Sequence, residues 1–503
     1  MLRTIKRRNS NRQQQKQDNK KLNDPIQSDL ETNAKHIKEL YSYGTNKDFS
    51  VRELTAQYNK KRVNLFFYGT IVNGDKIYEA IIRPLLEAEG DKLEDIITVE
   101  SIKDVTTLGD AIEEINSGNA ILFIDGQTTA YSIGVAQFQH RSIGKAENES
   151  LIKGPQEAFT ESLYINVSLL RKRIHDKQLI TEAKQLGSRS KTELNFVYIK
   201  DLVNEDILKN LKERLDKIDI DNVRNLELLE QLIEDRPYSV VPTILYTERP
   251  DKAASFIENG HVVLLMDNSS SCLILPVTFW SFFHSQEDRY LRFLYGNFTR
   301  IIRMLAFFLT TMISATYVAL ATFHSSMLPP DLLLAITASR ERVPFPLIFE
   351  VLIMEVAFEL IREAGIRIPN PLGPTIGIVG ALILGQAAVE ANIISPIIVI
   401  ISAVSGLTSF AVSDISINYT LRITRFLFIL AAGIFGMFSL MGAFMMWFMY
   451  VASIKSFGVP YFSPLSPGFT SPHDTLFRKA IRAEIFRPGQ IKPKDLQKKK
   501  KQS

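Results

Sequence analysis

The chain contains a single cysteine, Cys272, among its 503 residues. One thiol excludes an internal disulfide framework, and it excludes the zinc sites and redox motifs that need paired cysteines. The net charge of +4 is too small to indicate a nucleic-acid-binding protein. The first residues are basic, but no apolar run of about 7 to 15 residues follows them, so we expect no signal peptide.

Catalytic motifs are missing as well. The soluble half shows no nucleophile in a recognisable setting, no phosphate-binding loop and no paired acids. Five of the seven histidines are scattered without the spacing of metal ligands: His140, His175, His261, His284 and His324. We therefore expect no enzyme activity, no metal site and no cofactor.

What the chain has instead is a sharp division of hydropathy. Nearly all long apolar runs lie after Arg300, whereas the first 290 residues read as soluble sequence. Residues 1–59 are polar and rich in Gln, Asn and Lys, which predicts a disordered basic tail. Residues 456–503, which include the lysine-rich run 492–501, are predicted to be a C-terminal cytoplasmic tail. We favour solvated tails, with contact to anionic lipid as the alternative.

The soluble region reads as a duplication. Residues 60–150 and 195–290 each show a strand, a helix, a second strand, a second helix and a hairpin. This order predicts two tandem thioredoxin-like α/β subdomains, followed by a polytopic helical transmembrane domain; the alternative is a chance similarity of two α/β patterns. The middle strands are expected at 97–101 and 242–248, and the longer second copy is expected to carry an inserted helix at 223–235.

A helical segment, residues 151–194, is predicted to connect the two copies. Its helix ends in three basic residues, Arg171, Lys172 and Arg173. These charges either stabilise the helix end through the macrodipole or form a docking surface for a neighbouring subunit.

The second half, residues 291–455, is predicted to be a transmembrane domain. Four apolar runs are long enough to cross a bilayer, and an amphipathic or re-entrant helix accompanies them. The spans are assigned to 301–323, 374–390, 391–412 and 423–452, and the additional helix to 344–362. Arginines crowd the N-terminal side of the first span, so the positive-inside rule places that side and the soluble subdomains in the cytoplasm. Four spans return the C-terminal tail to the same side.

Carboxylates lie inside the apolar sequence of the additional helix. A carboxylate in hydrocarbon costs roughly 2.5 to 3.5 kcal/mol, so such residues usually face a protein interior or a water-filled path. At about 100 degrees per residue, Glu355, Glu359 and Glu363 share one face with Arg362, while Glu350 lies apart. The acidic face either lies along the membrane surface or forms a cation-favouring ring in a symmetric oligomer. Pairing of Glu359 with Arg362 at i,i+3 would weaken such a ring.

Small residues recur at steps of four in the second span. Gly377, Ala381 and Gly385 form a stripe that predicts close packing of helices inside lipid. Gln386 and Glu390 follow on a nearby face. They either hydrogen-bond to a neighbouring helix or contribute to a path for ions.

Five segments together resemble the A subunit of the bacterial spore germinant receptor, the GerA family. They are GPQEAFTESLYINVSLLRKRI, ERPDKAASFIENGHVVLLMD, HSQEDRYLR, SRERVPFPLIFEVLIMEVAFELIREAGIRIP and GPTIGIVGALILGQAAVEANIISP. The resemblance runs from about residue 64 to residue 461.

The resemblance implies a multi-pass protein of the spore inner membrane with two kinds of partner. One is a B subunit of amino-acid-permease type that recognises the nutrient, and the other is a C subunit that is a lipoprotein. It also implies that A subunits form a ring, expected to be a pentamer, that acts as a nutrient-gated channel for monovalent cations. The competing interpretation is a non-conducting scaffold whose cytoplasmic domains recruit other germination components.

Overall fold

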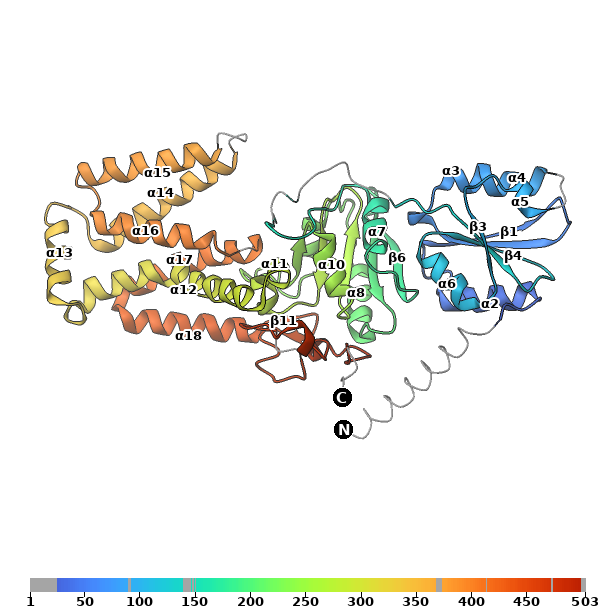
Figure 1. Cartoon of the computed structure of the whole chain (residues 1–503). Helices are drawn as coiled ribbons and strands as arrows, with labels where there is room; N and C mark the ends of the chain where they lie inside the picture. Colours follow the sequence, from blue (N-terminus) through green and yellow to red (C-terminus); the bar gives the residue numbers. More distant parts are fainter. Residues whose placement is uncertain are drawn as a thin grey trace.

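The structure, a computed structural model, describes residues 25–88, 92–138, 146, 149, 151–367, 373–412, 414–471 and 474–498. Three units follow one another along the molecule (Figure 1). The first α/β subdomain lies at one end, the second lies in the middle, and a helical bundle lies at the other end.

The first subdomain is a five-stranded sheet with helices on both faces. Its strand order is β1-β2-β4-β5-β3, and every pairing is antiparallel. The strands are β1 (Phe49–Thr55), β2 (Arg62–Tyr68), β3 (Ile102–Val105), β4 (Ala120–Ile124) and β5 (Ala130–Ile133). The helices are α2 (Leu30–Leu40), α3 (Gly74–Ile77), η2 (Tyr78–Ile82), α4 (Arg83–Glu87), α5 (Leu93–Ile96) and α6 (Leu108–Asn116).

Side-chain alternation along β2 accounts for the two helical layers. Val63 and Leu65 pack with buried residues of η2 and α4, whereas Phe66 and Tyr68 pack with α2 and α6. Successive side chains of a strand point to opposite faces, so a strand that is apolar on both faces must be covered on both. The two groups of helices lie on opposite sides of the sheet in Figure 1.

The second subdomain repeats this topology. Its sheet order is β6-β7-β9-β10-β8, again antiparallel throughout, which agrees with the predicted duplication. The strands are β6 (Leu179–Leu186), β7 (Thr192–Ile199), β8 (Leu245–Thr247), β9 (Val262–Met266) and β10 (Cys272–Leu275). The helices are α7 (Leu163–Arg171), α8 (Glu205–Asp216), α9 (Leu226–Ile233) and α10 (Pro250–Ile257).

The predicted order of elements, strand, helix, strand, helix and hairpin, is confirmed in both copies, but the pairing of the strands is not that of a thioredoxin-like sheet. A strand–helix–strand unit normally gives parallel pairing through a crossover. Here the strand that follows the first helices lies at a sheet edge instead: β3 pairs antiparallel with β5, and β8 with β10. The stretch 97–101, expected to be a strand, precedes β3. The observed sheets therefore do not support the thioredoxin-like detail.

Two predicted domain boundaries are also wrong. The first subdomain begins inside the predicted disordered tail 1–59, because α2 and β1 both belong to it. β1 is an edge strand whose residues are mostly half-buried or exposed, so its sequence reads as polar. The predicted connecting segment 151–194 includes β6, which pairs with β7 of the second sheet. The helix predicted at 223–235 is α9, which has eight residues. In the first subdomain, α5 stands at the corresponding place before β3 and has four residues.

The C-terminal segment packs on the second subdomain, so the prediction of a solvated lysine-rich end at 492–501 is wrong for its described part, residues 492–498. A short hairpin of β11 (Lys455–Ser456) and β12 (Val459–Pro460) opens it. Tyr461 and Ile491 are buried, and Lys494 forms an ion pair with Glu205 at 2.9 Å. Apolar residues that lie between the charged ones hold the segment in place. The average composition of the segment is polar and does not reveal them. Residues 499–503 lie outside the described residues.

Arg171 joins the two subdomains. Its Nε donates to Asp48 Oδ2 at 2.8 Å, and both side chains are 2% exposed. The guanidinium also lies over the ring of Tyr68, 4.0 Å from its centroid. The two following basic residues both pair with Glu157 at 2.7 Å. The basic end of α7 therefore docks against another part of the same chain.

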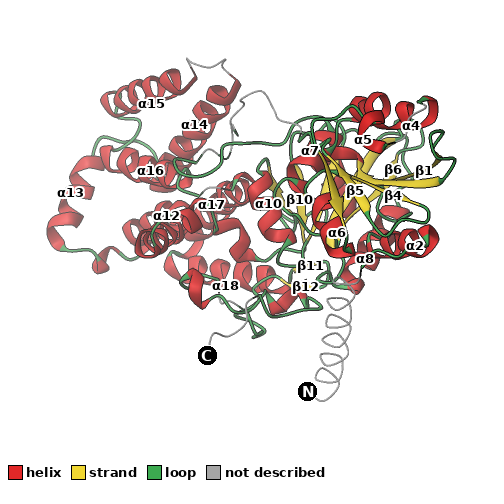
Figure 2. Cartoon of the chain, turned by 45° about the vertical axis from the view of Figure 1, so that its right-hand side comes forward, coloured by secondary structure: helices red, strands yellow, loops and turns green. Residues whose placement is uncertain are grey.

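The helical bundle comprises seven helices among the described residues. They are α12 (Phe293–Phe323), α13 (Pro330–Arg340), α14 (Leu347–Arg367), α15 (Gly373–Glu390), α16 (Pro396–Ser409), α17 (Ile415–Phe435) and α18 (Met437–Ser453). α12 packs against α16, α17 and α18, and α13 lies at the end of the bundle away from the soluble subdomains (Figures 1 and 2). By length and composition, α12 and α17 could each cross a membrane; α16 and α18 are shorter apolar helices.

The predicted span 423–452 is wrong as a single helix. The chain reverses at Gly436, between the last residue of α17 and the first of α18, and the two helices pack against each other. Gly436 has φ 64° and ψ −131°, a conformation that essentially only glycine adopts. A Cβ there would lie 2.7 Å from Cβ of Phe323. Hydropathy cannot detect this turn because apolar residues continue on both sides.

We predict that Gly436→Ala destabilises the bundle. The backbone conformation alone costs an alanine roughly 1 to 3 kcal/mol, and the contact with Phe323 adds to this. Gly442→Ala is the matched control, because Gly442 lies within α18 and a Cβ added there would meet no atom within 4 Å. Thermal unfolding in detergent should show a lower melting temperature for the first variant only; equal melting temperatures would contradict the assigned turn.

Candidate functional site

Three of the four acidic residues of α14, Glu350, Glu355 and Glu359, pair with residues of other helices in the bundle. α14 packs against α12, α15, α16 and α17, and Glu350 and Glu355 are both 0% exposed. Buried carboxylates require partners, since an isolated charge in a low-dielectric interior is strongly unfavourable. The structure supplies those partners from other helices.

Glu355 is held between α12 and α17. Its Oε2 lies 2.9 Å from Nη1 of Arg425, and its Oε1 accepts a hydrogen bond of 2.6 Å from Ser314. Arg425 is itself buried and also donates to Ser405 of α16 at 3.0 Å. One arginine therefore ties α14, α16 and α17 together.

Glu359, one turn further along α14, accepts from two arginines of α17. Arg422 Nε lies 2.7 Å from Oε2, and Arg425 Nη2 lies 2.6 Å from Oε1. The predicted i,i+3 pair with Arg362 is confirmed, at 3.5 Å. We call these five residues, Glu355, Glu359, Arg362, Arg422 and Arg425, the α14–α17 ion-pair network.

Glu350 lies apart from this network, as its helical phase predicted. It pairs with Arg340 of α13 at 2.9 Å, and its other oxygen accepts from the backbone N–H of Ser395 at 3.1 Å. Because Ser395 directly precedes α16, Glu350 fastens the three segments at the end of the bundle away from the soluble subdomains.

Three further candidates lie on the outside of the bundle. Glu363, Gln386 and Glu390 are exposed in the single chain. Gly385 is buried, and a Cβ there would lie 3.3 Å from Val399 of α16, which supports close packing at this position. Gly377 and Ala381 belong to α15, but their surroundings lie outside the described residues.

Sequence reasoning missed two of the three arginines of the network. Arg422 and Arg425 lie three residues apart in RITR, inside the apolar sequence of α17. The rule that drew attention to the glutamates, that ionisable residues in apolar segments are functional and paired, applies equally to these arginines. The two arginines in the apolar sequence of α17 could therefore have been predicted as candidate partners of Glu355 and Glu359.

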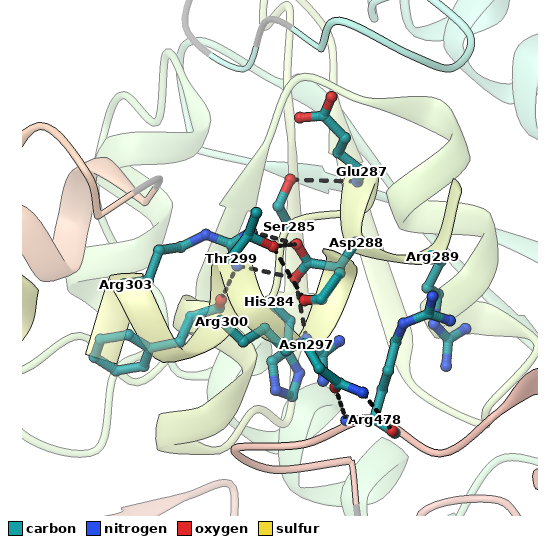
Figure 3. Close-up of polar contacts among 12 residues, drawn as sticks. His284, Ser285, Glu287, Asp288, Arg289, Asn297, Thr299, Arg300, Arg303 and Arg478 are labelled. Carbon is teal, nitrogen blue, oxygen red and sulfur yellow. Dashed lines mark hydrogen bonds and ion pairs between the residues drawn. The ribbon is translucent and has the colours of Figure 1, made fainter. Parts of the chain in front are cut away.

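A second charged cluster connects the bundle to the soluble part. Asp288, in the short helix α11 (Glu287–Tyr290), is 0% exposed. Its carboxylate accepts from Arg300 Nε at 3.1 Å and from Arg303 Nη1 at 2.9 Å, both on α12. Figure 3 shows the two arginines converging on it. Arg300 also forms an ion pair with Asp474 of the C-terminal segment. This Asp288 cluster therefore joins three segments that are distant in sequence.

Burial and neighbouring charges together set the pKa values in and near this cluster. Burial alone would raise the pKa of Asp288, but the hydrogen bonds and charges of Arg303 and Arg300 outweigh it and lower the pKa. Burial, assisted by the charge of Arg300, lowers the pKa of His284 to about 4. Burial likewise lowers the pKa of His261 to about 4. Both imidazoles are therefore neutral at pH 7, and Nε2 of His284 lies 2.7 Å from the carbonyl of Thr475.

Comparison with known proteins gives the family. The family model described as Bacillus/Clostridium GerA spore germination protein matches residues 35–490. The chain belongs to the GerA family. This match includes both soluble subdomains, the bundle and most of the C-terminal segment.

Relatives in the GerA family are similar over most of their length. Spore germination protein KA of Bacillus subtilis (strain 168) is 38% identical over 474 residues, which cover 92% of this chain and 87% of the relative. Spore germination protein GerLA of Bacillus cereus is 35% identical, with 90% and 94% covered. Spore germination protein A1 of Bacillus subtilis (strain 168) is 36% identical, with 85% and 90% covered. These are spore germination proteins rather than members of a known enzyme family.

A solved structure is also similar. The crystal structure of the N-terminal domain of the A subunit of the Bacillus megaterium spore germinant receptor GerK3 is 27% identical in sequence. It covers 51% of this chain and 98% of that domain, with a TM-score of 0.40. The strand pairings of this chain themselves define its fold.

For this GerA-family chain we predict that Arg425→Met is strongly destabilising. It leaves Glu355 buried without its cation, and breaking a buried pair from one side costs about 3 to 5 kcal/mol. The double variant Glu355→Gln/Arg425→Met should recover much of that loss, because no uncompensated charge remains. Arg342→Met, at an exposed position before α14, is the control. Unfolding in detergent measures all three; a double variant no better than the single one would contradict direct pairing.

We also predict acid sensitivity around the Asp288 cluster. The unfolded chain takes up protons on His261 and His284 below about pH 6.5, whereas the folded chain does so only near pH 4. Stability should therefore fall as pH drops from about 6.5 to 4 and should not depend on these groups above that window. His284→Gln should flatten this pH dependence relative to the wild type. Identical pH profiles of unfolding would refute the assignment.

Proposed function

We propose that this chain is the A subunit of a nutrient-responsive germinant receptor in the spore inner membrane, with its bundle crossing the bilayer several times. Support comes from the family and from helix length. α12 has 31 residues and is about 46 Å long at 1.5 Å per residue, which exceeds the hydrocarbon core of about 30 Å. α14, with 21 residues, is also long enough to span, so in place of the amphipathic or re-entrant helix expected at 344–362 we propose a spanning one.

The proposed orientation follows from where the helices meet the soluble part. Thr420 of α17 donates to the carbonyl of Val240, and Tyr450 of α18 hydrogen-bonds to Ser239 at 2.9 Å. α12 begins at the Asp288 cluster. The start of α12, the start of α17 and the end of α18 therefore lie on one side. The basic residues at the start of α12 favour the cytoplasm for that side.

We further propose that copies of this chain assemble into a ring, expected to be a pentamer, that conducts monovalent cations. A permease-like B subunit would recognise the nutrient, and a lipoprotein C subunit would complete the receptor. Glu363, Gln386 and Glu390 support this proposal because they are exposed on the bundle, where a neighbouring copy could bring them into a shared path. Rings of carboxylates favour cations in pores.

The α14–α17 ion-pair network is the observation that carries the gating part of the proposal. It contains three arginines and two glutamates, a formal net charge of 3 − 2 = +1. A buried cluster of that sign opposes the passage of a cation. Glu355 and Glu359 can therefore serve a cation path only after α14 separates from α17, so we assign the paired arrangement to the closed state.

The same observation also favours the competing function, a non-conducting scaffold. If the network never opens, Glu355 and Glu359 are structural residues, and the soluble subdomains act by recruiting other germination components. The two functions differ in one measurable property, the cation permeability of the reconstituted protein.

We predict that Glu359→Gln raises cation flux through the reconstituted chain. Loss of this carboxylate leaves Arg422 and Arg425 less well paired and weakens the closed arrangement, and each 1.4 kcal/mol lost shifts an equilibrium about tenfold. Potassium efflux from proteoliposomes is the measurement. Glu341→Gln, at an exposed position, is the control and should leave flux unchanged. Equal, background-level flux for wild type and both variants, with normal assembly, would support the scaffold instead.

A further inference from the structure

The first two turns of α12 expose large apolar side chains beside the soluble part. Leu294 is 79% exposed, and the residues around it on the same turns are exposed as well: Phe293, Tyr295 and Phe298. The opposite face of these turns is occupied, because Gly296 and Asn297 are buried. The exposed residues therefore form the outward side of a helix that is already fully packed on its inward side.

A stretch of the C-terminal segment lies against the same turns. The backbone N–H of Arg478 donates to Oδ1 of Asn297 at 2.8 Å, and its Nη2 donates to the carbonyl of Leu291 at 2.9 Å. On either side of Arg478, further large apolar residues are exposed: Leu476, Phe477 and Ile481. Two segments nearly 200 positions apart thus contribute to one apolar surface.

The charges on this surface have one sign. Arg292, Lys479 and Arg482 are exposed, and no acidic residue lies in residues 291–298 or 475–483. The neighbouring arginines of α12 point inward to the Asp288 cluster (Figure 3). We call the exposed apolar and basic residues of these two stretches the juxtamembrane patch.

We propose that the juxtamembrane patch binds the surface of a bilayer that carries anionic headgroups. This inference rests on the proposed membrane crossing of α12. The helix, about 46 Å long, matches the full bilayer of about 40 to 45 Å including headgroups, so its first turns lie at headgroup level. Aromatic residues favour that level, and basic residues close to it gain from anionic lipid.

Charge complementarity favours lipid over a second copy of the chain. A second copy would present the same basic patch, and like charges brought together oppose association. An anionic bilayer satisfies the basic residues and covers the aromatic ones at once. The C-terminal segment would then connect the bilayer surface to the Asp288 cluster through Arg478 and Asn297.

The test places an environment-sensitive fluorophore at residue 477 of the full chain in nanodiscs. Native Cys272 is 0% exposed, so Phe477→Cys provides the reactive thiol. Two labelled controls accompany it: Met445→Cys on α18, 66% exposed, and Tyr78→Cys on the first subdomain, 57% exposed. Nanodiscs of phosphatidylcholine with and without phosphatidylglycerol are compared, using lipids that carry quenchers at the headgroup or along the acyl chain.

We expect headgroup quenching at residue 477 that increases with phosphatidylglycerol, acyl-chain quenching at 445 and none at 78. Lys479→Glu/Arg482→Glu should abolish the increase with phosphatidylglycerol, since each basic residue contributes about fivefold to binding at an anionic surface. Quenching at 445 without any at 477 would overturn the inference and leave the membrane crossing intact. Absence of quenching at 445 would overturn both. A fluorophore at 477 shielded from lipid quenchers and from aqueous iodide would mean that protein covers the patch, which also overturns it.

Discussion

The pairing of buried charges is the constraint on which this structure depends. A charge removed from water is tolerated only with a partner close by, and removal of one partner is far more costly than removal of both. Three such pairings follow one another along the molecule: Arg171 with Asp48, Asp288 with Arg300 and Arg303, and Arg425 with Glu355. Each joins segments that are separate along the chain, and each lies at a junction between units or helices.

These junctions form a continuous physical connection. Arg171 fixes the first subdomain to the second, and the Asp288 cluster fixes the second to the start of α12. α12 packs along α17, which carries the arginines that hold α14. Packed cores and charged pairs change between discrete arrangements rather than deforming gradually. The contacts therefore link the soluble subdomains to α14 through a series of buried charged pairs and one packed helix.

Much of this organisation could be predicted from the sequence where local pattern decides the outcome. The duplication, the helix around 344–362, the pair Glu359–Arg362 and the separate position of Glu350 all follow from periodicity along one segment. The strand order could not be predicted, because edge pairing of β3 and β8 depends on which strands meet after folding. β1 was missed because an edge strand need not be apolar. The reversal at Gly436 was missed because both flanking helices are apolar, so hydropathy shows no break.

The partners of the glutamates could not be predicted from local sequence pattern, because they are brought close only by folding. Helical phase placed Glu355 and Glu359 on one face, but the sequence of α14 alone cannot say what that face meets. Arg422 and Arg425 lie more than 60 positions away, and only the packing of α14 on α17 brings them within hydrogen-bonding distance. Once they are present, the question of function changes. A face of free carboxylates would attract cations without further help, whereas a face neutralised by arginines must first be uncovered, so any conduction along it requires a conformational step.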